Sequence, residues 1–372
     1  MSKKILIMAA GTGGHIIPGL AIAKKLKEEN SDTQIEWLGT HKGLEVKLVS
    51  KENIKINYIS VWGLRNKSIL IKLLAPFRLS YAVLQSIFIM LKYKPNIVLG
   101  MGGFVCGPGG IAAFLTGRKL YIHEQNAVAG FTNTVLARIA NKVFESFPNS
   151  FNKIESKINN KLIYTGNPIR QEILDIPKPQ ERYKNKSNSK DLNILIIGGS
   201  RGAVALNKLI PEFVNNLINK QDLKVTLNIT HQCGDLNYQD TLKIYKKYNL
   251  DNKENINLIK YIENIVDYYS KADLIICRAG AMTVSEIAAV GIAAIFIPFP
   301  QAVDDHQTKN AKFLVQNDAA VIMQQKDITA EKLTNEVLSL INTDGRLLEM
   351  AKHAVNCSKN DALNIISKSI LV

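Results

Sequence analysis

The chain has 372 residues, of which 46% are hydrophobic and 21% are charged. This length favours two domains, and the composition is that of a globular protein and excludes a disordered or fibrous one. The four cysteines stand far apart with no CxxC pair, which argues for a reducing compartment and against a disulfide framework or a zinc site. The start MSKK and the short apolar stretch after it do not have the pattern of a signal peptide.

The net charge of +15 is concentrated in one half of the chain. Residues 1–168 carry 22 lysines and arginines against 9 aspartates and glutamates, whereas the remainder carries 25 against 23. A lysine-rich codon usage would raise lysine throughout the chain, so it explains this uneven distribution poorly. The excess favours a partner with negative charge, such as a membrane surface or phosphate groups. We expect no nucleic-acid partner.

Strands and helices alternate along most of the chain. Short apolar runs predict buried strands at Ile5–Met8, Ile35–Leu38, Ile97–Leu99, Leu120–Ile122, Ile194–Ile197, Val225–Ile229, Leu274–Cys277 and Ala294–Ile297. Helical patterns lie between them, for example at Pro18–Glu29, Ala203–Ile218, Val284–Val290 and His306–Gln316. This alternation predicts the α/β class, with parallel sheets covered by helices on both faces.

The chain repeats its opening pattern once. KILIMAAGTGGH at residues 4–15 is echoed by NILIIGGSRGA at 193–203, and each is a strand, a glycine-rich turn and a helix start. The polar stretch 176–191 before the second start predicts a surface loop. We therefore expect two similar doubly wound domains facing each other across a cleft, with ligands bound at the carboxyl ends of the strands.

The first glycine-rich turn, at residues 10–15, ends with His15 at the mouth of a helix. A strand, a glycine turn and a helix N-terminus form an anion-binding site, because the first backbone N–H groups of a helix have no partner within it. The turn is not a dinucleotide fingerprint, since Ile16 stands where a glycine is required, and it is not a Walker loop. His15 has two open readings: a histidine bound to a backbone carbonyl, or a catalytic group.

Further polar or glycine-rich loops follow later strands. GMGGFVCGPGG at 100–110 and GGSRGA at 198–203 each follow a strand, and Ser200 could donate its hydroxyl to a phosphate. HEQNAVAG at 123–130 concentrates hydrogen-bonding side chains at a strand end, which favours a site over a plain polar loop. Arg170, after the turn in GNPIR, would pair with a phosphate or with a surface acid.

CRAGAMTVSE at 277–286 predicts a strand end, a turn and a helix start. Thr283 and Glu286 have the spacing of a capping box, and the alternative is that Glu286 binds a ribose diol. In DDHQ at 304–307, Asp304 or Asp305 is expected to cap a helix. The sequence has no DxD, HExxH or GxSxG motif, so we expect no metal site, no cofactor and no serine nucleophile.

Residues 65–94 contain six basic residues and no acidic one. Their longest uncharged run, Leu79–Leu91, has 13 residues, whereas a transmembrane helix needs about 20. A buried amphipathic helix is one interpretation. A basic, apolar helix in the basic half of the chain also suits contact with an anionic membrane surface, and we favour that interpretation.

These motifs together resemble the MurG family of bacterial UDP-N-acetylglucosamine:lipid-linked N-acetylmuramyl-pentapeptide N-acetylglucosaminyltransferases. The motifs that carry the resemblance, in this order and spacing, are GTGGHIIPGLA, HEQNAVAGFTN, GNPIR, GGSRGA, CRAGAMTVSEIAAVG and DDHQTKNA. The match spans about 300 residues, from Gly11 to roughly Ala311. It implies the GT-B fold of two Rossmann-like domains, with an acceptor and membrane-binding domain at 1–167, a donor domain at 168–352 and a final helix, about 353–372, that packs back on the first domain.

The resemblance also implies the substrates and the location. The donor is UDP-N-acetylglucosamine, the acceptor is N-acetylmuramyl-pentapeptide on undecaprenyl diphosphate (lipid I), and the enzyme attaches peripherally to the cytoplasmic face of the cell membrane. Cell-wall and division proteins are implied as further partners. Carried over by position, the residues expected at the substrates are Thr12, Gly13, Gly14, Asn126, Arg170, Ser200, Ile262, Ala281, Met282, Thr283, Val284, Ser285, Glu286 and Gln307.

The implied reaction is a single inverting displacement, in which the 4-hydroxyl of the acceptor attacks the anomeric carbon and UDP leaves. It needs a base, for which we choose His15 with Glu124 as the alternative, and positive potential at the departing diphosphate, supplied by helix N-termini, Ser200 and Arg170. Arg201 departs from the family pattern and would add positive charge beside Ser200. Two other functions remain open: a different UDP-N-acetylglucosamine enzyme of this fold, such as a 2-epimerase or a soluble-acceptor transferase, and a non-enzymatic membrane scaffold.

Overall fold

The computed structural model describes residues 3–61, 75–185, 191–199, 202–221 and 223–372. The chain divides into two compact units, of which unit 1 is Met1–Arg170 with Lys359–Val372 and unit 2 is Gln171–Ser358. Residues 168–170, expected in the second domain, thus belong to unit 1. The helix expected at about 353–372 is two helices: α16 (Arg346–Cys357) ends in unit 2, and α17 (Ala362–Leu371) belongs to unit 1.

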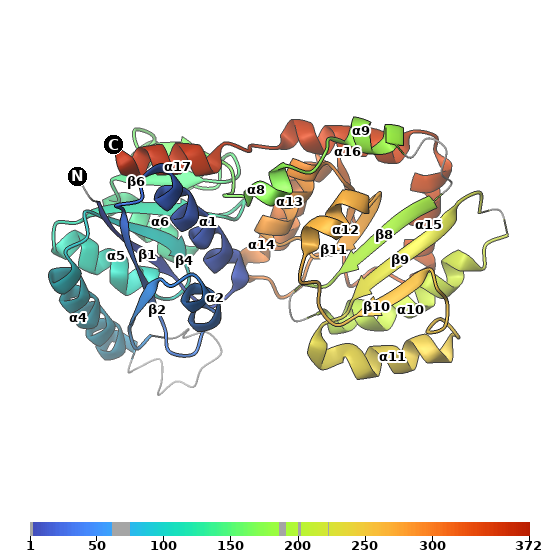
Figure 1. Ribbon diagram of the computed structural model, residues 1–372, viewed down its shortest axis with the longest axis horizontal. Coiled ribbons are helices and arrows are strands. Elements are labelled where there is room, and N and C mark those ends of the chain that lie inside the picture. Colours follow the sequence, from blue (N-terminus) through green and yellow to red (C-terminus); the bar gives the residue numbers. More distant parts are fainter. Residues whose placement is uncertain (1–2, 62–74, 186–190, 200–201, 222) are drawn as a thin grey trace. The chain divides into compact units, whose positions relative to one another are not determined.

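Unit 1 is built on a parallel sheet of seven strands in the order β3-β2-β1-β4-β5-β6-β7 (Figure 1). The register pairs Lys4 with Gln34 on one side of β1 and Ile5 with Ile97 on the other. The strands are β1 (Lys4–Ala9), β2 (Gln34–Gly39), β3 (Lys55–Tyr58), β4 (Ile97–Gly102), β5 (Lys119–Glu124), β6 (Lys142–Glu145) and β7 (Leu162–Tyr164).

Helices cover both faces of this sheet because side chains alternate along each strand. Ile5 and Ile7 of β1 are buried in the same cluster as residues of α1, α2 and α17, whereas Leu6 and Met8 are buried with residues of α4, α5 and α6. Besides α17, the helices of unit 1 are α1 (Gly13–Glu29), α2 (Glu45–Lys51), α4 (Ala75–Tyr93), α5 (Cys106–Leu115), α6 (Phe131–Ile139) and α7 (Glu155–Ile158).

Unit 2 repeats this plan with six parallel strands in the order β10-β9-β8-β11-β12-β13. Its strands are β8 (Asp191–Ile197), β9 (Thr226–Gln232), β10 (Ile256–Ile259), β11 (Leu274–Cys277), β12 (Ala293–Phe296) and β13 (Ala320–Ile322). Besides α16, its helices are α8 (Gln171–Leu174), α9 (Pro179–Asn185), α10 (Val204–Ile218), α11 (Tyr238–Lys247), α12 (Ile265–Lys271), α13 (Ala281–Val290), α14 (His306–Val315) and α15 (Ala330–Asn342), with 3₁₀ turns at Asp235–Asn237 and Val303–Asp305.

The strand order reverses direction once in each sheet, between β1 and β4 in unit 1 and between β8 and β11 in unit 2. In doubly wound sheets, the loops that leave the carboxyl ends of two such strands diverge and open a crevice where ligands bind. The predicted glycine-rich loops after Ala9, Gly102, Ile197 and Cys277 all leave these four strands. The predicted α/β fold of two Rossmann-like domains is therefore confirmed.

Candidate functional site

His15 lies at the reversal point of the sheet in unit 1. It occupies the first turn of α1, and its ring is half-buried between the loops that leave β1 and β4. Its Nδ1 lies 3.4 Å from the carbonyl oxygen of Ala10 and 3.5 Å from the hydroxyl of Thr12. When Nδ1 donates to Ala10, the neutral ring presents its lone pair at Nε2, as a general base requires.

Two glycines of the β4 loop make room for this arrangement. A Cβ on Gly102 would lie 2.5 Å from the His15 ring, and one on Gly103 would lie 2.4 Å from the Ala10 carbonyl oxygen. Both glycines also have positive φ angles, +118° and +85°, which side chains rarely adopt. The second glycine-rich motif therefore supports the His15 side chain, a role that its sequence alone did not indicate.

Thr12, Gly13 and Gly14 precede His15 in the same loop. Thr12 and Gly14 are exposed, and Thr12 is the N-cap of α1 although its side chain makes no capping hydrogen bond. The backbone groups of this turn and the His15 ring thus share one open loop at the carboxyl edge of the sheet. Glu45, which no sequence motif indicated, is completely buried and accepts a hydrogen bond from the Gly11 N–H at 3.1 Å.

Glu124, at the end of β5, organises the HEQN loop. Its side chain is 3% exposed and accepts four hydrogen bonds of 2.8–3.1 Å. The donors are the backbone N–H groups of Asn126 and Gly130 and the side-chain amides of Asn126 and Asn133. A carboxylate has about four lone-pair positions, so these donors saturate Glu124.

His123 and Gln125 connect this loop to the rest of unit 1. The Gln125 amide donates to the Met101 carbonyl at 2.7 Å, and His123 Nε2 lies 3.1 Å from the Gly166 carbonyl oxygen. Burial lowers the pKa of His123 to about 4, so this ring is neutral at pH 7. In unit 2, burial likewise lowers the pKa of His231 to about 3.

The lowered pKa values of His123 and His231 predict that the protein loses stability in acid. Each has a lower pKa when folded than when unfolded, near 6.5, so the unfolded chain binds more protons between about pH 4 and 6.5. The free energy of unfolding should fall as the pH falls through this window, by about 1.4 kcal/mol per pKa unit for each histidine as an upper limit. Urea unfolding at pH 5 and 7.5 measures this difference. His123→Gln should reduce it, and an unchanged difference would contradict the assignment.

Arg170 is the last residue of the first segment of unit 1. Its Nε is buried and has no hydrogen-bond partner among the described residues. A buried guanidinium N–H without an acceptor is costly, because such a group normally donates to an oxygen. An anionic oxygen of a substrate would remove that cost, whereas the alternative of a surface ion pair has no support in the described contacts.

In unit 2, Ile262 lies in the loop after β10 and is 5% exposed. Its N–H donates to Oε1 of Gln232 at 3.2 Å, and the Gln232 amide donates to the Gly199 carbonyl at 3.1 Å. Gln232 thus joins the loops that follow β8 and β10. Ser200 and Arg201, which we expected beside the diphosphate, lie outside the described residues.

The CRAGAMTVSE motif forms the end of β11 and the start of α13. The predicted capping box is wrong: α13 begins at Ala281 with Gly280 as its N-cap and without a side-chain cap, so Glu286 lies in the second turn. Glu286 instead accepts a hydrogen bond from the Tyr269 hydroxyl at 3.1 Å. Ala281, Met282 and Thr283 supply the first N–H groups of the helix, which have no partner within it.

Other members of the predicted set have different surroundings. Val284 is completely buried and its N–H donates to the Gly280 carbonyl, so it anchors α13, while Ser285 is half-buried. Gln307, in the first turn of α14, accepts from the Phe299 N–H at 2.9 Å. Asp305 occupies the N-cap position of α14 but makes no side-chain cap, and Asp304 and Asp305 both have left-handed backbones.

Arg278, which we did not single out, joins the loops after β11 and β12. It is 9% exposed and donates to the carbonyl oxygens of Ile297 and Pro298 and to the side-chain oxygen of Gln325. Burial lowers its pKa to about 10, so the side chain is still a cation at pH 7. The reversal point of unit 2 therefore carries a fixed positive charge and the amino end of α13.

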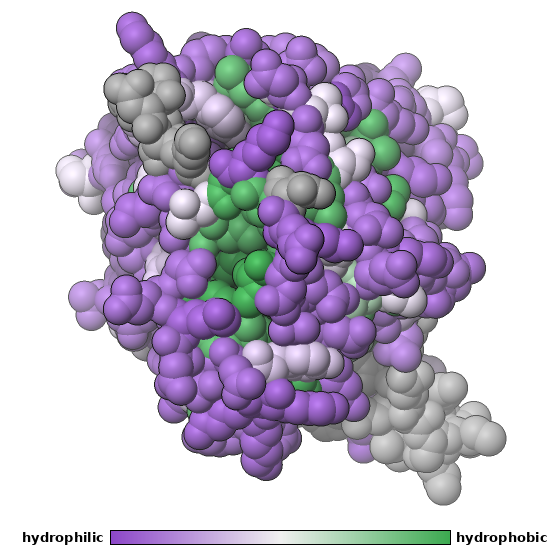
Figure 2. All heavy atoms as spheres, turned by 90° about the vertical axis from the view of Figure 1, so that its right-hand side faces the viewer, coloured by the Kyte–Doolittle hydropathy of each residue, from purple (hydrophilic) through white to green (hydrophobic). Residues whose placement is uncertain are grey.

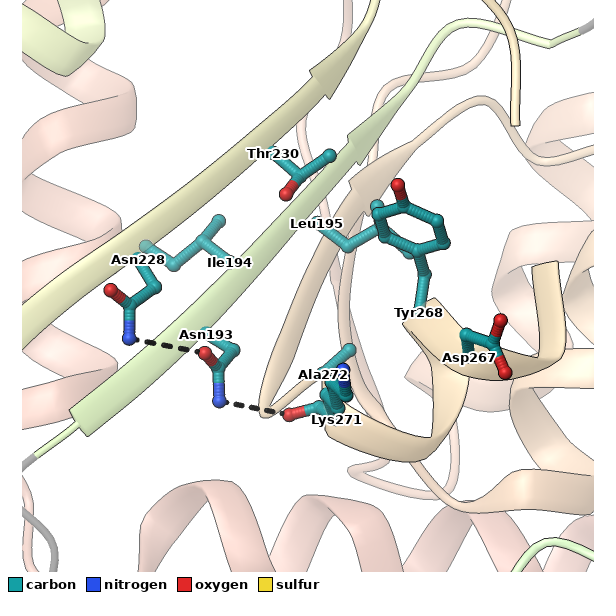
Figure 3. A pocket seen from close by; sticks show the side chains of 9 residues that line it. All are labelled: Asn193, Ile194, Leu195, Asn228, Thr230, Asp267, Tyr268, Lys271 and Ala272. Atoms are coloured by element: carbon teal, nitrogen blue, oxygen red, sulfur yellow. Dashed lines mark hydrogen bonds between the residues drawn. The ribbon is translucent and has the colours of Figure 1, made fainter. Parts of the chain in front are cut away.

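Unit 2 also has a pocket of about 360 Å³ away from these loops (Figure 3). Asn193, Asn228 and Thr230 line it from the middle of β8 and β9, and Tyr268 and Lys271 line it from α12. The Asn228 amide donates to Asn193, which itself donates to the Lys271 carbonyl. Helix α12 has seven residues, and the pocket beside it is lined by polar and apolar side chains together.

Unit 2 also has apolar side chains in a hollow at the end where β8 and β9 begin. Figure 2 shows this end as mostly hydrophilic, with apolar side chains gathered in one hollow.

Within the part of the chain that the structure describes, no three His, Cys, Asp or Glu residues form a group that could hold a metal ion. None of the described helices is long and apolar enough to cross a membrane.

Family models match both units. Residues 5–145 match the glycosyltransferase family 28 N-terminal domain, and residues 193–367 match the glycosyltransferase family 28 C-terminal domain. A solved UDP-GlcNAc 2-epimerase from Neisseria meningitidis has a TM-score of 0.69 at 16% identity, over 99% of both chains, and so shares only the fold.

Relatives with higher identity have one name. The chain is 45% identical to an Acinetobacter baumannii UDP-N-acetylglucosamine–N-acetylmuramyl-(pentapeptide) pyrophosphoryl-undecaprenol N-acetylglucosamine transferase, over 98% of this chain and 97% of that protein. The same-named protein of Paraburkholderia xenovorans is 41% identical over 98% and 94%. The crystal structure of A. baumannii MurG has a TM-score of 0.80 at 39% identity, over 99% of both chains. The chain therefore belongs to the MurG family of N-acetylglucosamine transferases.

Proposed function

We infer that this protein transfers N-acetylglucosamine from UDP-N-acetylglucosamine to N-acetylmuramyl-pentapeptide on undecaprenyl diphosphate, the step from lipid I to lipid II in peptidoglycan synthesis. The observation that carries this inference is the 41–45% identity to transferases of that name over nearly the whole chain. The chemistry of the loops agrees with it, because unit 1 offers a histidine at its reversal point and unit 2 offers a buried cation and a helix N-terminus at its own.

The reaction is one displacement with inversion at the anomeric carbon. The acceptor 4-hydroxyl loses its proton to Nε2 of His15 while its oxygen forms the bond to C1 of N-acetylglucosamine. The bond from C1 to the diphosphate oxygen breaks, and the electron pair leaves with UDP. General base catalysis contributes typically about 10²–10⁴-fold to the rate, and fixed positive charge stabilises the diphosphate as it departs.

We propose His15 and not Glu124 as the base. The Glu124 carboxylate already accepts four hydrogen bonds within its own loop, so its geometry suits holding Asn126 in place. His15 lies in the more open β1 loop, where Thr12, Gly13 and Gly14 would meet the sugars.

The donor is proposed to contact several residues of unit 2 and also Arg170, which belongs to unit 1. Ile262 would meet the uracil through its backbone, which requires Gln232 to release the Ile262 N–H. The start of α13 would bind the diphosphate, and Glu286 would bind the ribose. Gln307 would bind the sugar hydroxyls, and Arg170 and Ser200 would add charge and a hydroxyl at the phosphates.

A transfer assay tests the function directly. Incubation with labelled UDP-N-acetylglucosamine and a short-chain lipid I analogue should yield a labelled disaccharide lipid and one equivalent of UDP. Formation of UDP-N-acetylmannosamine without acceptor would instead indicate a 2-epimerase, which the 16% identity to such an enzyme does not favour. If neither product forms, the scaffold alternative holds and the proposed function is wrong.

We propose that α4 attaches unit 1 to the membrane. Its apolar stripe consists of side chains on one helix face that are each 55–75% exposed: Phe77, Tyr81, Leu84, Phe88 and Leu91. The opposite face, with Ala82, Ser86 and Met90, is buried. The interpretation as a buried amphipathic helix thus fits one face of α4 and does not account for the exposed apolar stripe on the other. The excess of lysine and arginine in residues 1–168 would favour anionic lipids, and the cytoplasmic face of the cell membrane is the proposed location.

The double variant Leu84→Ser and Phe88→Ser should weaken binding to vesicles of phosphatidylglycerol and phosphatidylcholine about tenfold or more. Each buried apolar side chain contributes roughly 1.5–3 kcal/mol, and these two side chains are each more than half exposed. Vesicle co-sedimentation measures the partition coefficient. Leu236→Ser, at a side chain 92% exposed in unit 2, is the matched control. Equal partitioning of the double variant and the wild type would exclude the stripe as the attachment surface.

A further inference from the structure

Glu45 is a buried carboxylate that accepts hydrogen bonds from two residues, Thr40 and Gly11. It begins α2, is 0% exposed, and lies against Gly39 and Gly43, where any side chain would collide with it. Its Oε1 accepts hydrogen bonds from the Thr40 N–H at 2.9 Å and the Thr40 hydroxyl at 2.7 Å. Its Oε2 accepts from the Gly11 N–H at 3.1 Å. The amino end of α2 also favours negative charge at this position.

The Gly11 N–H belongs to the same peptide unit as the Ala10 carbonyl. Its nitrogen donates to Glu45, and its carbonyl oxygen lies 3.4 Å from Nδ1 of His15. In a trans peptide the N–H and C=O groups point in opposite directions, so this unit connects the carboxylate on one side with the imidazole on the other. Hydrogen bonds that share a peptide unit polarise one another, so the bond to Glu45 makes the carbonyl a better acceptor.

The surroundings hold this peptide unit in one orientation. Gly11 has a φ of +93°, a conformation that glycine adopts without strain. The Ala10 N–H lies 3.4 Å from the Gly102 carbonyl, and the Trp37 indole donates to the Ala9 carbonyl at 2.8 Å. Rotation of the peptide would break the hydrogen bond to Glu45 and would leave the Gly11 N–H without this acceptor.

We propose that Glu45 is a positioning residue for the transfer reaction, which acts on His15 through the Ala10–Gly11 peptide. It holds the Ala10 carbonyl toward Nδ1, which keeps the proton of the neutral ring on Nδ1 and the lone pair on Nε2. This proposal rests on the proposed transfer function and on His15 as the general base of that reaction.

The tautomer of His15 gives the first test. In ¹⁵N spectra of histidine-labelled protein at pH 8, with the His15 signals identified by their loss in His15→Ala, the wild type should show the Nδ1–H tautomer. Glu45→Gln should move the ring toward the Nε2–H tautomer, because one amide cannot accept from both Thr40 and Gly11. Thr12→Val should leave the tautomer unchanged. If the wild-type protein shows the Nε2–H tautomer of His15, the proposal is wrong, whatever the variants show.

Kinetics give the second test. Glu45→Gln should lower kcat about 10–100-fold, the range typical of residues that orient a reacting group, with the KM for UDP-N-acetylglucosamine within about twofold. Glu36→Gln is the matched control, because Glu36 is a carboxylate of β2 that binds Lys55 and Asn57. Thermal unfolding of both variants separates lost stability from lost catalysis.

The results of these experiments distinguish a failure of the role proposed for Glu45 from a failure of the proposed transfer function. A wild-type protein without transfer activity would reject the proposed function. An active wild type with a normal kcat and an unchanged tautomer in Glu45→Gln would reject the role of Glu45 alone. If Glu45→Gln fails to fold, the wild-type tautomer decides.

Discussion

His15→Ala should lower kcat about 10²–10⁴-fold while the Kd for UDP-N-acetylglucosamine changes less than about threefold. The imidazole is the group proposed to take the proton from the acceptor hydroxyl, whereas the donor is proposed to bind mainly the loops of unit 2. Single-turnover transfer measures the chemical step, and calorimetry measures donor binding. Because the ring is half-buried over Gly102 and contributes nothing to the apolar core, its loss should leave the fold intact.

His41→Ala is the control for this experiment. His41 is an exposed histidine of the same unit, and its ring stacks on Tyr58 with 4.3 Å between ring centroids. It should retain the wild-type kcat. Near-normal turnover of His15→Ala would reject His15 as the base.

Arg170→Met should lower kcat about 10²–10³-fold, the usual loss when a group that stabilises developing charge is removed. The buried Nε has no acceptor among the described residues, and a diphosphate oxygen is the partner that we propose for it. Methionine keeps the apolar length of the side chain without its charge. Arg170→Lys should recover only part of the activity, because lysine keeps the charge but loses the planar set of donors.

Arg138→Met is the control here, since Arg138 lies exposed in the last turn of α6. Rates with the same short-chain acceptor should be unchanged in that variant. If Arg170→Met instead raises only the KM for the donor and leaves kcat unaltered, Arg170 contributes to binding the intact donor. It would then not stabilise the departing diphosphate in the transition state.

The central strands could be predicted from the sequence because they are buried on both faces. Ile5–Met8 and Leu274–Cys277 are continuous apolar runs, and the structure confirms both as strands. The missed strands have three or four residues and include half-buried positions, so their local pattern resembles that of loops: they are β3, β6, β7, β10 and β13. Helix α1 begins at Gly13, five residues before the predicted start, because Pro18 is tolerated within it.

Some features of the candidate site could likewise be predicted from the sequence, and others could not. Glycine-rich turns directly after strands indicated where the loops gather, because the carboxyl ends of parallel strands lie at one edge of the sheet. The role of Glu45 could not be predicted, because its partner Gly11 lies 34 residues away and only the pairing of β1 with β2 brings them together. The capping box failed because Gly280, not Thr283, ends the turn, and a local motif does not indicate which residue begins the helix.

The position of α17 has a consequence for how the protein is made. Its residues Ala362, Ile366 and Ile370 are buried in the core of unit 1 with Ile16 and Ile22, and Lys3 donates to the Ile370 carbonyl. A ribosome produces the first segment of unit 1, then the whole of unit 2, and only then this helix. During translation unit 1 therefore has an open apolar face while unit 2 is being made. Loss of the codons for α17 would consequently damage the unit that contains the amino-terminal half of the protein.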